Sequence, residues 1–346
     1  MINRLLIVNL AVLATFITDL QGPQLSAQEK QMLTSPYLGG IILFSRHFES
    51  LAQLKNLTQE ISEINDQLLI TVDHEGGRVQ RFRQGFTPVP AMGRLGELYR
   101  TSPVQARQAA KSCAVVLASE LLNAGIHLTY APVLDIDYAR NQVIGDRGFS
   151  MEPSIVAELA AQFMLGLKEM NFAVVGKHFP GHGWVTLDSH VACPVDERPL
   201  RDIQAADMQP FQNLLPSIDW MMPAHVVYSQ VDDEPAGFSK VWLQDILRQS
   251  LNYRGRIVSD DLSMAGAAVK GNYWQRAQAA LAAGCDILLA CNSSAASMEI
   301  LAGLAASQVT PLSLAQYQPS IEPSGVLQAT GYQQAKALLS TLDLLA

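Results

Sequence analysis

The chain has 346 residues, of which 49% are hydrophobic and 16% charged, and its formal net charge is −8. This composition is typical of a globular protein that buries a large core. The negative charge argues against general nucleic-acid binding, because a polyanion requires a basic protein face. It leaves room for a small anionic ligand at a local cationic site.

The chain opens with an apolar segment. Arg4 precedes a short apolar run over residues 5–14, which has roughly the shape of a signal peptide. The run is too short to span a membrane, Asn9 interrupts it, and no A-x-A cleavage site follows. The four cysteines form no C-x-x-C pair and no zinc-finger spacing, which suits reduced thiols. We expect a cytoplasmic protein with residues 1–15 as an apolar extension, and export through this segment is the alternative.

Eight short apolar runs follow, most of them with a polar or glycine-rich exit. They occupy residues 16–20, 40–44, 68–72, 128–134, 172–175, 220–223, 256–258 and 285–290. Stretches of helical composition separate these runs. They include residues 51–65, 104–124, 154–170, 241–251 and 273–283, and a helical tail occupies residues 331–345.

This alternation predicts an α/β fold. Near-continuous apolar strands between helices indicate a parallel sheet that is covered on both faces. Eight such units indicate a single (β/α)8 TIM barrel, which we expect to form one catalytic domain over residues 1–346. A doubly wound open sheet is the competing architecture, but no G-x-G-x-x-G turn follows the first strand.

Polar residues are concentrated at the predicted carboxyl ends of the strands, where a barrel carries its functional groups. The segments that follow the third to seventh strands hold several polar residues each. Those that follow the first, second and eighth strands carry only Asp19, Arg46 and Asn292. The segments after the third to seventh strands contain Asp73 and Arg81, then Asp135, Asp137 and Arg147, then Lys177 and His178, then His225, and finally Asp260 and Asp261.

The densest of these exits covers residues 176–190. It holds Lys177, His178, His182, Asp188 and His190 within fifteen positions. Residues 172–175 lead into it like a buried strand, and Pro and Gly residues at 180, 181 and 183 then break regular structure. The pattern predicts a ligand site on a loop after the fifth strand.

The residue types favour a polyhydroxylated ligand such as a sugar. Arg81, Arg147 and Lys177 offer hydrogen-bond donors, and Asp73 offers an acceptor that can bridge vicinal hydroxyls. A carboxylate at Asp260 could act as a nucleophile, a metal ligand or a hydrogen-bond acceptor. Asp188, two residues before His190, can fix the tautomer of that imidazole and stabilise its charged form for acid–base work.

These motifs resemble those of family 3 β-N-acetylhexosaminidases of the bacterial peptidoglycan-recycling type. Residues 177–183 with Asp188 and His190 look like the family signature, and residues 72–82, 144–147 and 259–264 agree in order and spacing. The resemblance runs from about Phe16 to the C-terminus. His74, where the family commonly has Gln, and Gly148 depart from the pattern without removing a functional residue.

The resemblance implies a retaining glycosidase without a cofactor or metal. Asp260 would be the nucleophile, and His190, oriented by Asp188, the general acid and then the general base. The −1 subsite would bind N-acetylglucosamine through a set of five side chains, namely Asp73, Arg81, Arg147, Lys177 and His178. The implied substrates are 1,6-anhydro-N-acetylmuramic acid peptides carrying a terminal β-linked N-acetylglucosamine. We expect a monomer with this small carbohydrate partner, no nucleic acid and no membrane span.

Three alternatives stay open at this point. A zinc hydrolase could use His178 and His182 with ligands from Asp188, His190 and His225. A second alternative is a sugar-binding protein that has lost catalysis. Such a protein would lack the nucleophile or the acid/base, whereas Asp260, Asp188 and His190 are all present. Within the enzyme class, phosphate could replace water as the acceptor in the second step. We further expect Asp261 to be structural and His182 to shape its loop.

Overall fold

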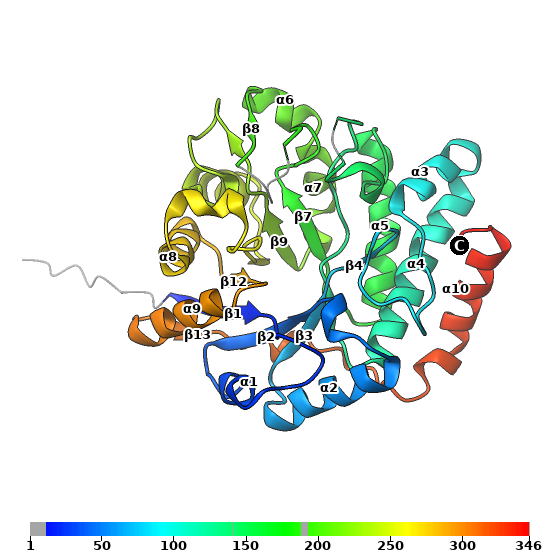
Figure 1. Cartoon of the computed structure of the whole chain (residues 1–346). Coiled ribbons are helices and arrows are strands. Elements are labelled where there is room, and N and C mark those ends of the chain that lie inside the picture. The colour runs from blue at the N-terminus through cyan, green and yellow to red at the C-terminus, as the bar shows by residue number, and fades with distance from the viewer. Residues whose placement is uncertain (1–11, 141, 188–192, 346) are drawn as a thin grey trace, which may run out of the picture.

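The protein is described by a computed structural model that covers residues 12–140, 142–187 and 193–345. The strands gather in the middle of the molecule, and the helices lie around them (Figure 1). The strands are β1 (Leu13–Thr18), β2 (Leu38–Leu43), β3 (Leu69–Val72), β4 (His74–Gly76), β5 (Val79–Gln80), β6 (Leu128–Thr129), β7 (Val175–Phe179), β8 (Val195–Asp196), β9 (Trp220–Pro223), β10 (Val227–Tyr228), β11 (Arg256–Ile257), β12 (Ile287–Ala290) and β13 (Thr310–Pro311).

The main helices follow the strands along the chain. They are α1 (Ala27–Met32), α2 (Leu51–Ile64), α3 (Met92–Thr101), α4 (Pro103–Asn123), α5 (Pro153–Glu169), α6 (Leu200–Ala205), α7 (Met208–Leu214), α8 (Tyr273–Ala283), α9 (Ser294–Ala306) and α10 (Thr330–Thr341). The predicted helices coincide with α2, α4, α5, α8 and α10. The stretch predicted over 241–251 is helical as well, but Val241–Ser250 is a π-helix. Helices α1, α3, α6, α7 and α9 are not among the predicted ones. In α9 the apolar side chains are spread around the helix, so the sequence carries little amphipathic signal.

Two parallel sheets contain the eight predicted strands. One has the order β12-β1-β2-β3-β6, with β13 also paired to β1, and the other has the order β11-β9-β7. Isolated parallel bridges join Val133 to Lys177 and Val258 to Ile287, at the two places where the sheets meet. No closed sheet is found among the described residues. The parallel α/β architecture is therefore confirmed, whereas a closed (β/α)8 barrel is not.

Several strand boundaries differ from the prediction. β6 is the largest difference at a carboxyl end, since it stops at Thr129 rather than at Leu134. β1 begins at Leu13 rather than at Phe16, because Leu13 and Ala14 pair with β13. The apolar segment predicted as an extension therefore ends in a strand, and its residues 1–11 lie outside the described residues. β7 runs to Phe179, so that Lys177 and His178 belong to a strand and not to the loop after it. The sequence placed them outside because charged residues rarely occupy buried strand positions.

The core lies on both sides of the strands. One cluster is built from alternate strand residues such as Ile17, Ile42, Leu69, Val175 and Ile287. Their neighbours in sequence, including Phe16, Ile41 and Leu288, pack with the helices in a second and larger cluster. Strands buried on both faces explain why the sequence shows continuous apolar runs without polar alternation.

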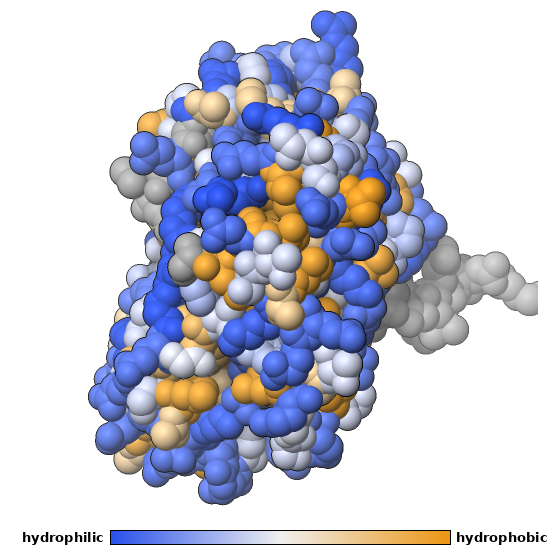
Figure 2. Space-filling view, turned by 90° about the vertical axis from the view of Figure 1, so that its right-hand side faces the viewer, coloured by the Kyte–Doolittle hydropathy of each residue, from blue (hydrophilic) through white to orange (hydrophobic). Residues whose placement is uncertain are grey.

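The outer surface is mixed in character. Figure 2 shows the side of the molecule around α3 and α10, where apolar residues form small groups between polar ones. In the part of the chain that the structure describes, no helix is long and apolar enough to cross a membrane. Cys113, Cys285 and Cys291 are buried, and they and Cys193 are free thiols.

Candidate active site

A cavity of about 560 Å³ lies at the carboxyl ends of the central strands. It brings together side chains that are far apart in the sequence, and most of the predicted site residues line it. These are Asp73, Arg81, Arg147, Lys177, His178 and Asp260. Asp188 and His190 lie outside the described residues, so their positions stay predictions. Thr186, shortly before them in the chain, also lines the cavity.

Lys177 lies at the centre of an ion-pair network. Its Nζ is 2.9 Å from Oδ1 of Asp73 and 2.7 Å from Oε1 of Glu75. Burial alone would lower the pKa of Lys177, but the carboxylates of Asp73 and Glu75 outweigh it and raise the pKa. The ammonium is therefore charged. Arg81 Nη2 approaches Asp73 Oδ2 at 3.7 Å, which leaves Asp73 between two cations.

Glu75 connects this network to Arg147. Arg147 donates from Nε and Nη2 to the two carboxylate oxygens of Glu75, each at 2.8 Å. Burial would raise the pKa of Glu75, but Arg147 and Lys177 hold it well below the usual range. No role for Glu75 was predicted from the sequence. A signal was available, because Asp73 and Glu75 are two residues apart and point to the same side of an extended segment.

A second network fixes His178. Its Nδ1 is 2.6 Å from Oδ2 of Asp135, and the backbone N–H groups of His178 and His182 also donate to this carboxylate. Burial would raise the pKa of Asp135, but the charge and hydrogen bond of His178 outweigh it and lower the pKa. Asp135 therefore stays ionised and orients the imidazole, with Nε2 on the side away from Asp135. The prediction that His182 shapes its loop agrees with the bond from its backbone to Asp135.

Asp260 follows β11 at the wall of the cavity. Its Oδ1 accepts a hydrogen bond of 2.8 Å from the backbone N–H of Asp261. Asp261 accepts from the N–H groups of Ser263 and Cys291, which ties the end of β11 to the end of β12. Burial raises the pKa of Asp261 to about 6. These contacts agree with the structural role that the sequence suggested for Asp261.

The family of this chain follows from comparison with known proteins. The model of the glycosyl hydrolase family 3 N-terminal domain matches residues 2–318. A β-hexosaminidase of Nitrosospira multiformis is 50% identical over 294 residues, which are 84% of each chain. One from Methylobacillus flagellatus is 51% identical over 294 residues, again 84% of each chain. The chain belongs to glycosyl hydrolase family 3. It is a hydrolase of the β-N-acetylhexosaminidase type.

Solved structures agree with this assignment. The crystal structure of NagZ from Neisseria gonorrhoeae superposes with a TM-score of 0.88 at 41% identity, covering 97% of this chain and 99% of that one. The same protein in complex with N-trifluoroacetyl-D-glucosamine gives a TM-score of 0.86 at 41% identity, covering 96% and 99%. The resemblance in the sequence therefore identified the family correctly. The assignment as a hydrolase overturns the alternative of a binding protein without catalysis.

In this family 3 hydrolase, Trp184 and Arg198 flank the segment that carries Asp188 and His190, and they contact each other. The ring of Trp184 has the guanidinium of Arg140 at 3.9 Å and that of Arg198 at 4.3 Å from its centroid. Arg198 in turn binds the buried carboxylates of Asp196 and Asp207. Trp184 precedes the segment and Arg198 follows it. Their contact therefore holds the two ends of the segment together.

The described residues do not test the zinc alternative, because two of its ligands, Asp188 and His190, lie outside them. The rings of His178 and His182 are 6.0 Å apart between centroids and lie at 66° to each other. His225 instead stacks on Phe238 at 5.3 Å, and its Nε2 is 3.2 Å from the backbone oxygen of Asp261. Among the described residues, which leave out Asp188 and His190, no group of three or more potential metal ligands occurs.

Proposed function

We propose that the chain is a retaining β-N-acetylglucosaminidase. It removes terminal non-reducing N-acetylglucosamine from 1,6-anhydro-N-acetylmuramic acid peptides during cell-wall recycling. The observation that carries the proposal is the shared cavity: Asp260 lines it together with Asp73, Arg147, Lys177 and His178. A carboxylate that shares a cavity with hydrogen-bond donors and acceptors suited to sugar hydroxyls is compatible with the −1 subsite of a retaining glycosidase.

The ionic network suits the hydroxyl groups of a sugar in the −1 subsite. Lys177, Arg81 and Arg147 supply donors, and Asp73 supplies an acceptor that can bridge two neighbouring hydroxyls. Each of these charges already has a protein partner, so an uncharged sugar can bind without leaving a buried charge unpaired. Nε2 of His178 adds one more polar group on the wall of the same cavity.

The reaction proceeds in two displacements. In the first, an oxygen of Asp260 bonds to the anomeric carbon while the bond to the leaving oxygen breaks, and His190 gives that oxygen a proton. In the second, His190 takes a proton from water as the water oxygen displaces Asp260 from the anomeric carbon. Asp188 orients His190 and stabilises its charged form. Two inversions at one carbon retain its configuration.

We also propose that the two sheets form one closed (β/α)8 barrel in a single domain, with the first residues as a short extension. The bridges Val133–Lys177 and Val258–Ile287 support closure, because they lie at the two junctions between the sheets. The inner apolar cluster supports it as well, since all eight predicted strand segments contribute residues. A cytoplasmic, cofactor-free monomer completes the proposal.

The decisive experiment compares the wild type with Asp260→Ala on 4-nitrophenyl N-acetyl-β-D-glucosaminide. We expect the wild type to release nitrophenol and the variant to be inactive with an unchanged melting temperature. The corresponding β-glucoside is the control and should not be cleaved. Near-normal turnover by the variant would remove Asp260 as the nucleophile. Phosphate-free buffer, with a search for sugar 1-phosphate after phosphate is added, separates hydrolysis from phosphorolysis.

The role of His190 is tested by its dependence on the leaving group. His190→Ala should slow cleavage of substrates with a poor leaving group by about 10²–10⁴, the usual contribution of general acid–base catalysis. An activated nitrophenyl leaving group needs little protonation. The rate of the first displacement should therefore fall much less with that substrate. Equal losses on both substrates would contradict the acid role.

A further inference from the structure

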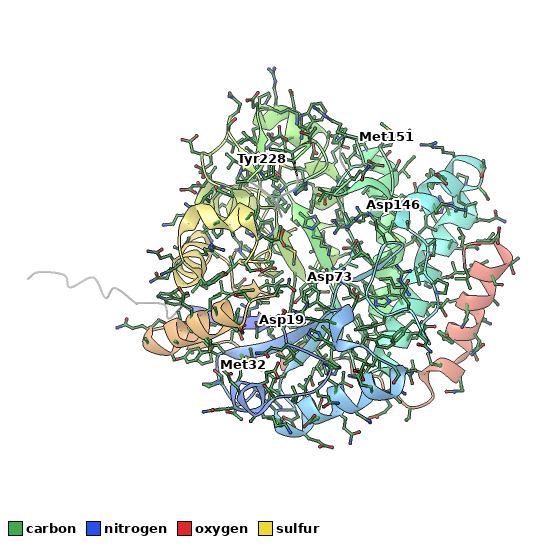
Figure 3. All side chains as sticks on the ribbon, viewed as in Figure 1. Asp19, Met32, Asp73, Asp146, Met151 and Tyr228 are labelled. Atoms are coloured by element: carbon green, nitrogen blue, oxygen red, sulfur yellow. The ribbon has the colours of Figure 1, made fainter. Side chains whose placement is uncertain are left out.

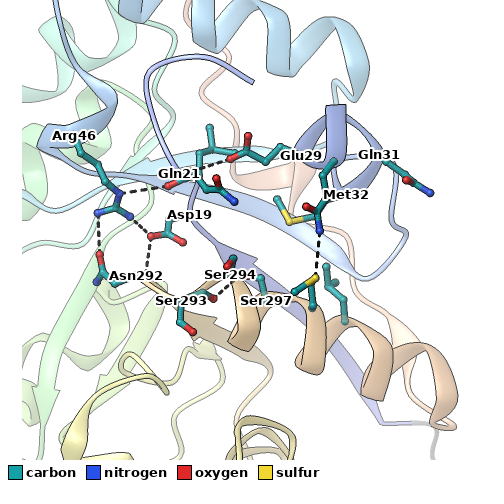
Figure 4. A pocket seen from close by; sticks show the side chains of 14 residues that line it. Asp19, Gln21, Glu29, Gln31, Met32, Arg46, Asn292, Ser293, Ser294 and Ser297 are labelled. Atoms are coloured by element: carbon teal, nitrogen blue, oxygen red, sulfur yellow. Dashed lines mark hydrogen bonds and ion pairs between the residues drawn. The ribbon is translucent and has the colours of Figure 1, made fainter. Parts of the chain in front are cut away.

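A second cavity of about 690 Å³ lies beside the active-site cavity, between α1 and α9 (Figure 4). Its residues follow β1, β2 and β12, the three strands whose exits looked modest in the sequence. Asn292 lines both cavities. In the view of Figure 3, Asp19 lies between Asp73 of the active site and Met32 at the wall of the second cavity.

A hydrogen-bonded ridge separates the two cavities. Arg46 Nη1 donates to Asn292 Oδ1 at 2.8 Å and pairs with the carboxylate of Asp19. Asp19 also accepts from the backbone N–H of Asn292 at 2.7 Å. The guanidinium of Arg46 lies 4.7 Å from the ring centroid of Phe44, which lines the active-site cavity. The ridge is thus held in place by the contacts of Arg46 with Asp19, Asn292 and Phe44.

The walls of the second cavity combine apolar and neutral polar groups. Leu20, Met32, Met298 and Leu301 are apolar, and Gln31 and Ser294 offer amide and hydroxyl groups. Its charged side chains are already engaged, since Arg46 pairs with Asp19 and Glu29 accepts from Gln21 N and Ser26 N. This lining suits a peptide, whose amides need donors and acceptors and whose small side chains need apolar contact.

The path of the leaving group also leads toward the second cavity, provided that the proposed function holds. The sugar hydroxyls are held by the ionic network on β3, β4 and β7, and the anomeric carbon lies at Asp260 after β11. The leaving group is attached at this carbon. Asp261, next to Asp260, accepts from the backbone N–H of Cys291, so the nucleophile lies beside the exit of β12, where Asn292 and Asp19 form the ridge.

We propose that the cavity between α1 and α9 binds the peptide of the leaving group. The amino sugar that is attached to the released N-acetylglucosamine crosses the Arg46–Asn292 ridge, and its peptide occupies the second cavity. This inference rests on the proposed function, because it concerns the aglycone of the same substrate. It predicts that the peptide lowers KM, whereas the chemical step is unaffected.

Filling the cavity tests the proposal. Ser294→Trp and Met298→Trp each introduce a large ring from α9 at positions that are exposed to solvent and tolerate it. The matched control is Ala306→Trp, an exposed position of the same helix that does not line the cavity. Three substrates are compared: the nitrophenyl glycoside, the peptide-free disaccharide with an anhydro sugar, and that disaccharide carrying its peptide.

We expect each filling variant to raise KM for the peptide-bearing substrate by about tenfold, the effect of losing roughly 1.4 kcal/mol of binding. The nitrophenyl glycoside and the peptide-free disaccharide should change less than about twofold. In the wild type, removing the peptide should raise KM by a similar factor. Ala306→Trp should behave as the wild type on all three substrates.

Other outcomes overturn the proposal. Equal KM values for the two disaccharides in the wild type would show that the peptide is not bound at all. Equal losses on both disaccharides in the filling variants would assign the cavity to the sugar and not to the peptide. Failure of the wild type to cleave the nitrophenyl glycoside would instead contradict the proposed function itself. Melting temperatures identify any variant that fails to fold, and the wild-type comparison needs no variant.

Discussion

Buried charges in the active site are each matched by a partner of opposite sign. Lys177, at 3% side-chain exposure, contacts Asp73 and Glu75, and Glu75, at 4%, also contacts Arg147. Removing one member of such a group leaves an uncompensated charge, which is far more costly than removing a surface pair. The network is therefore already assembled in the absence of a ligand, so a sugar meets donors and acceptors that are in place.

At the same scale, Asp135 should matter for catalysis although it does not line the cavity. Asp135→Asn keeps the size of the side chain but replaces the ionised acceptor of His178 Nδ1 with a neutral amide. We expect kcat/KM to fall by about 5- to 150-fold, corresponding to the 1–3 kcal/mol of a mismatched buried hydrogen bond. The measurement is kcat/KM of the nitrophenyl glycoside as a function of pH.

Asp137→Asn is the control for this prediction. Asp137 is partly exposed and accepts a hydrogen bond from Ala139 N, without the contacts to His178 and His182 that Asp135 makes. It should leave both the rate and the pH profile unchanged. A wild-type rate in Asp135→Asn would show that the carboxylate does not position His178.

At the scale of helices and strands, the close packing of α4 against α5 requires a glycine at one position. Gly166 lies in α5, and a Cβ added there would approach Lys111 O at 2.4 Å and Ala114 Cβ at 2.8 Å. Helix propensity favours Ala over Gly by about 1 kcal/mol, but overpacking against a neighbouring backbone costs about 1–3 kcal/mol. We therefore expect Gly166→Ala to lower the free energy of unfolding, measured by urea denaturation.

The control for this element is Gly331 in α10. A Cβ at Gly331 meets nothing within 4 Å. Gly331→Ala should therefore raise the free energy of unfolding by about 0.5 kcal/mol, through helix propensity alone. Opposite signs at the two glycines are the expected result. If both variants gained stability, the crossing of α4 and α5 would have to be wider than the structure gives.

The whole molecule should lose stability in mild acid because of its histidines. Burial lowers the pKa of His47, His127 and His182 to about 4 and that of His74 to about 3, and it also lowers the pKa of His225. In the unfolded chain these groups titrate near 6.5, so the unfolded state binds protons first. Their contribution to stability is present above pH 6.5 and is lost as the pH falls toward 4.

Three carboxyl groups oppose this trend. Burial raises the pKa of Asp261 to about 6, and it also raises the pKa of Asp19 and Asp207. The folded state binds these protons more readily than the unfolded state does. The free energy of unfolding that these three groups contribute therefore rises as the pH falls from about 6 toward 4. We expect the larger number of histidines to prevail, which gives a net decrease in the urea midpoint between pH 6.5 and 4.5.

His74→Gln separates the contribution of the histidines to the pH dependence of stability from that of the carboxyl groups. His74 is 2% exposed and lies within 5.8 Å of the rings of Phe82 and Phe86, measured between centroids. A glutamine there cannot be protonated, so the variant should lose less stability on acidification than the wild type. A slope identical to that of the wild type would show that His74 is protonated as easily in the folded state as in the unfolded one.

The parallel α/β architecture and the family could be predicted from the sequence alone, as could six of the side chains that line the active-site cavity. Strands buried on both faces need continuous apolar runs, and cavity residues follow the strands, so both features are local in the chain. Asp73, Arg81, Arg147 and Asp260 were found in this way. The same reasoning placed Lys177 and His178 just beyond a strand, because local pattern cannot show that a buried charge has a partner.

Which groups meet in space follows from the fold and not from the sequence pattern. Glu75 joins Lys177 to Arg147, and Asp135 orients His178, across separations in sequence that no motif records. The cavity between α1 and α9 likewise depends on the parallel pairing of β12 with β1, which brings residues 15–18 beside residues 287–290. Pairing and ion contacts are fixed by packing over long separations, and for this reason the sequence left them undetermined.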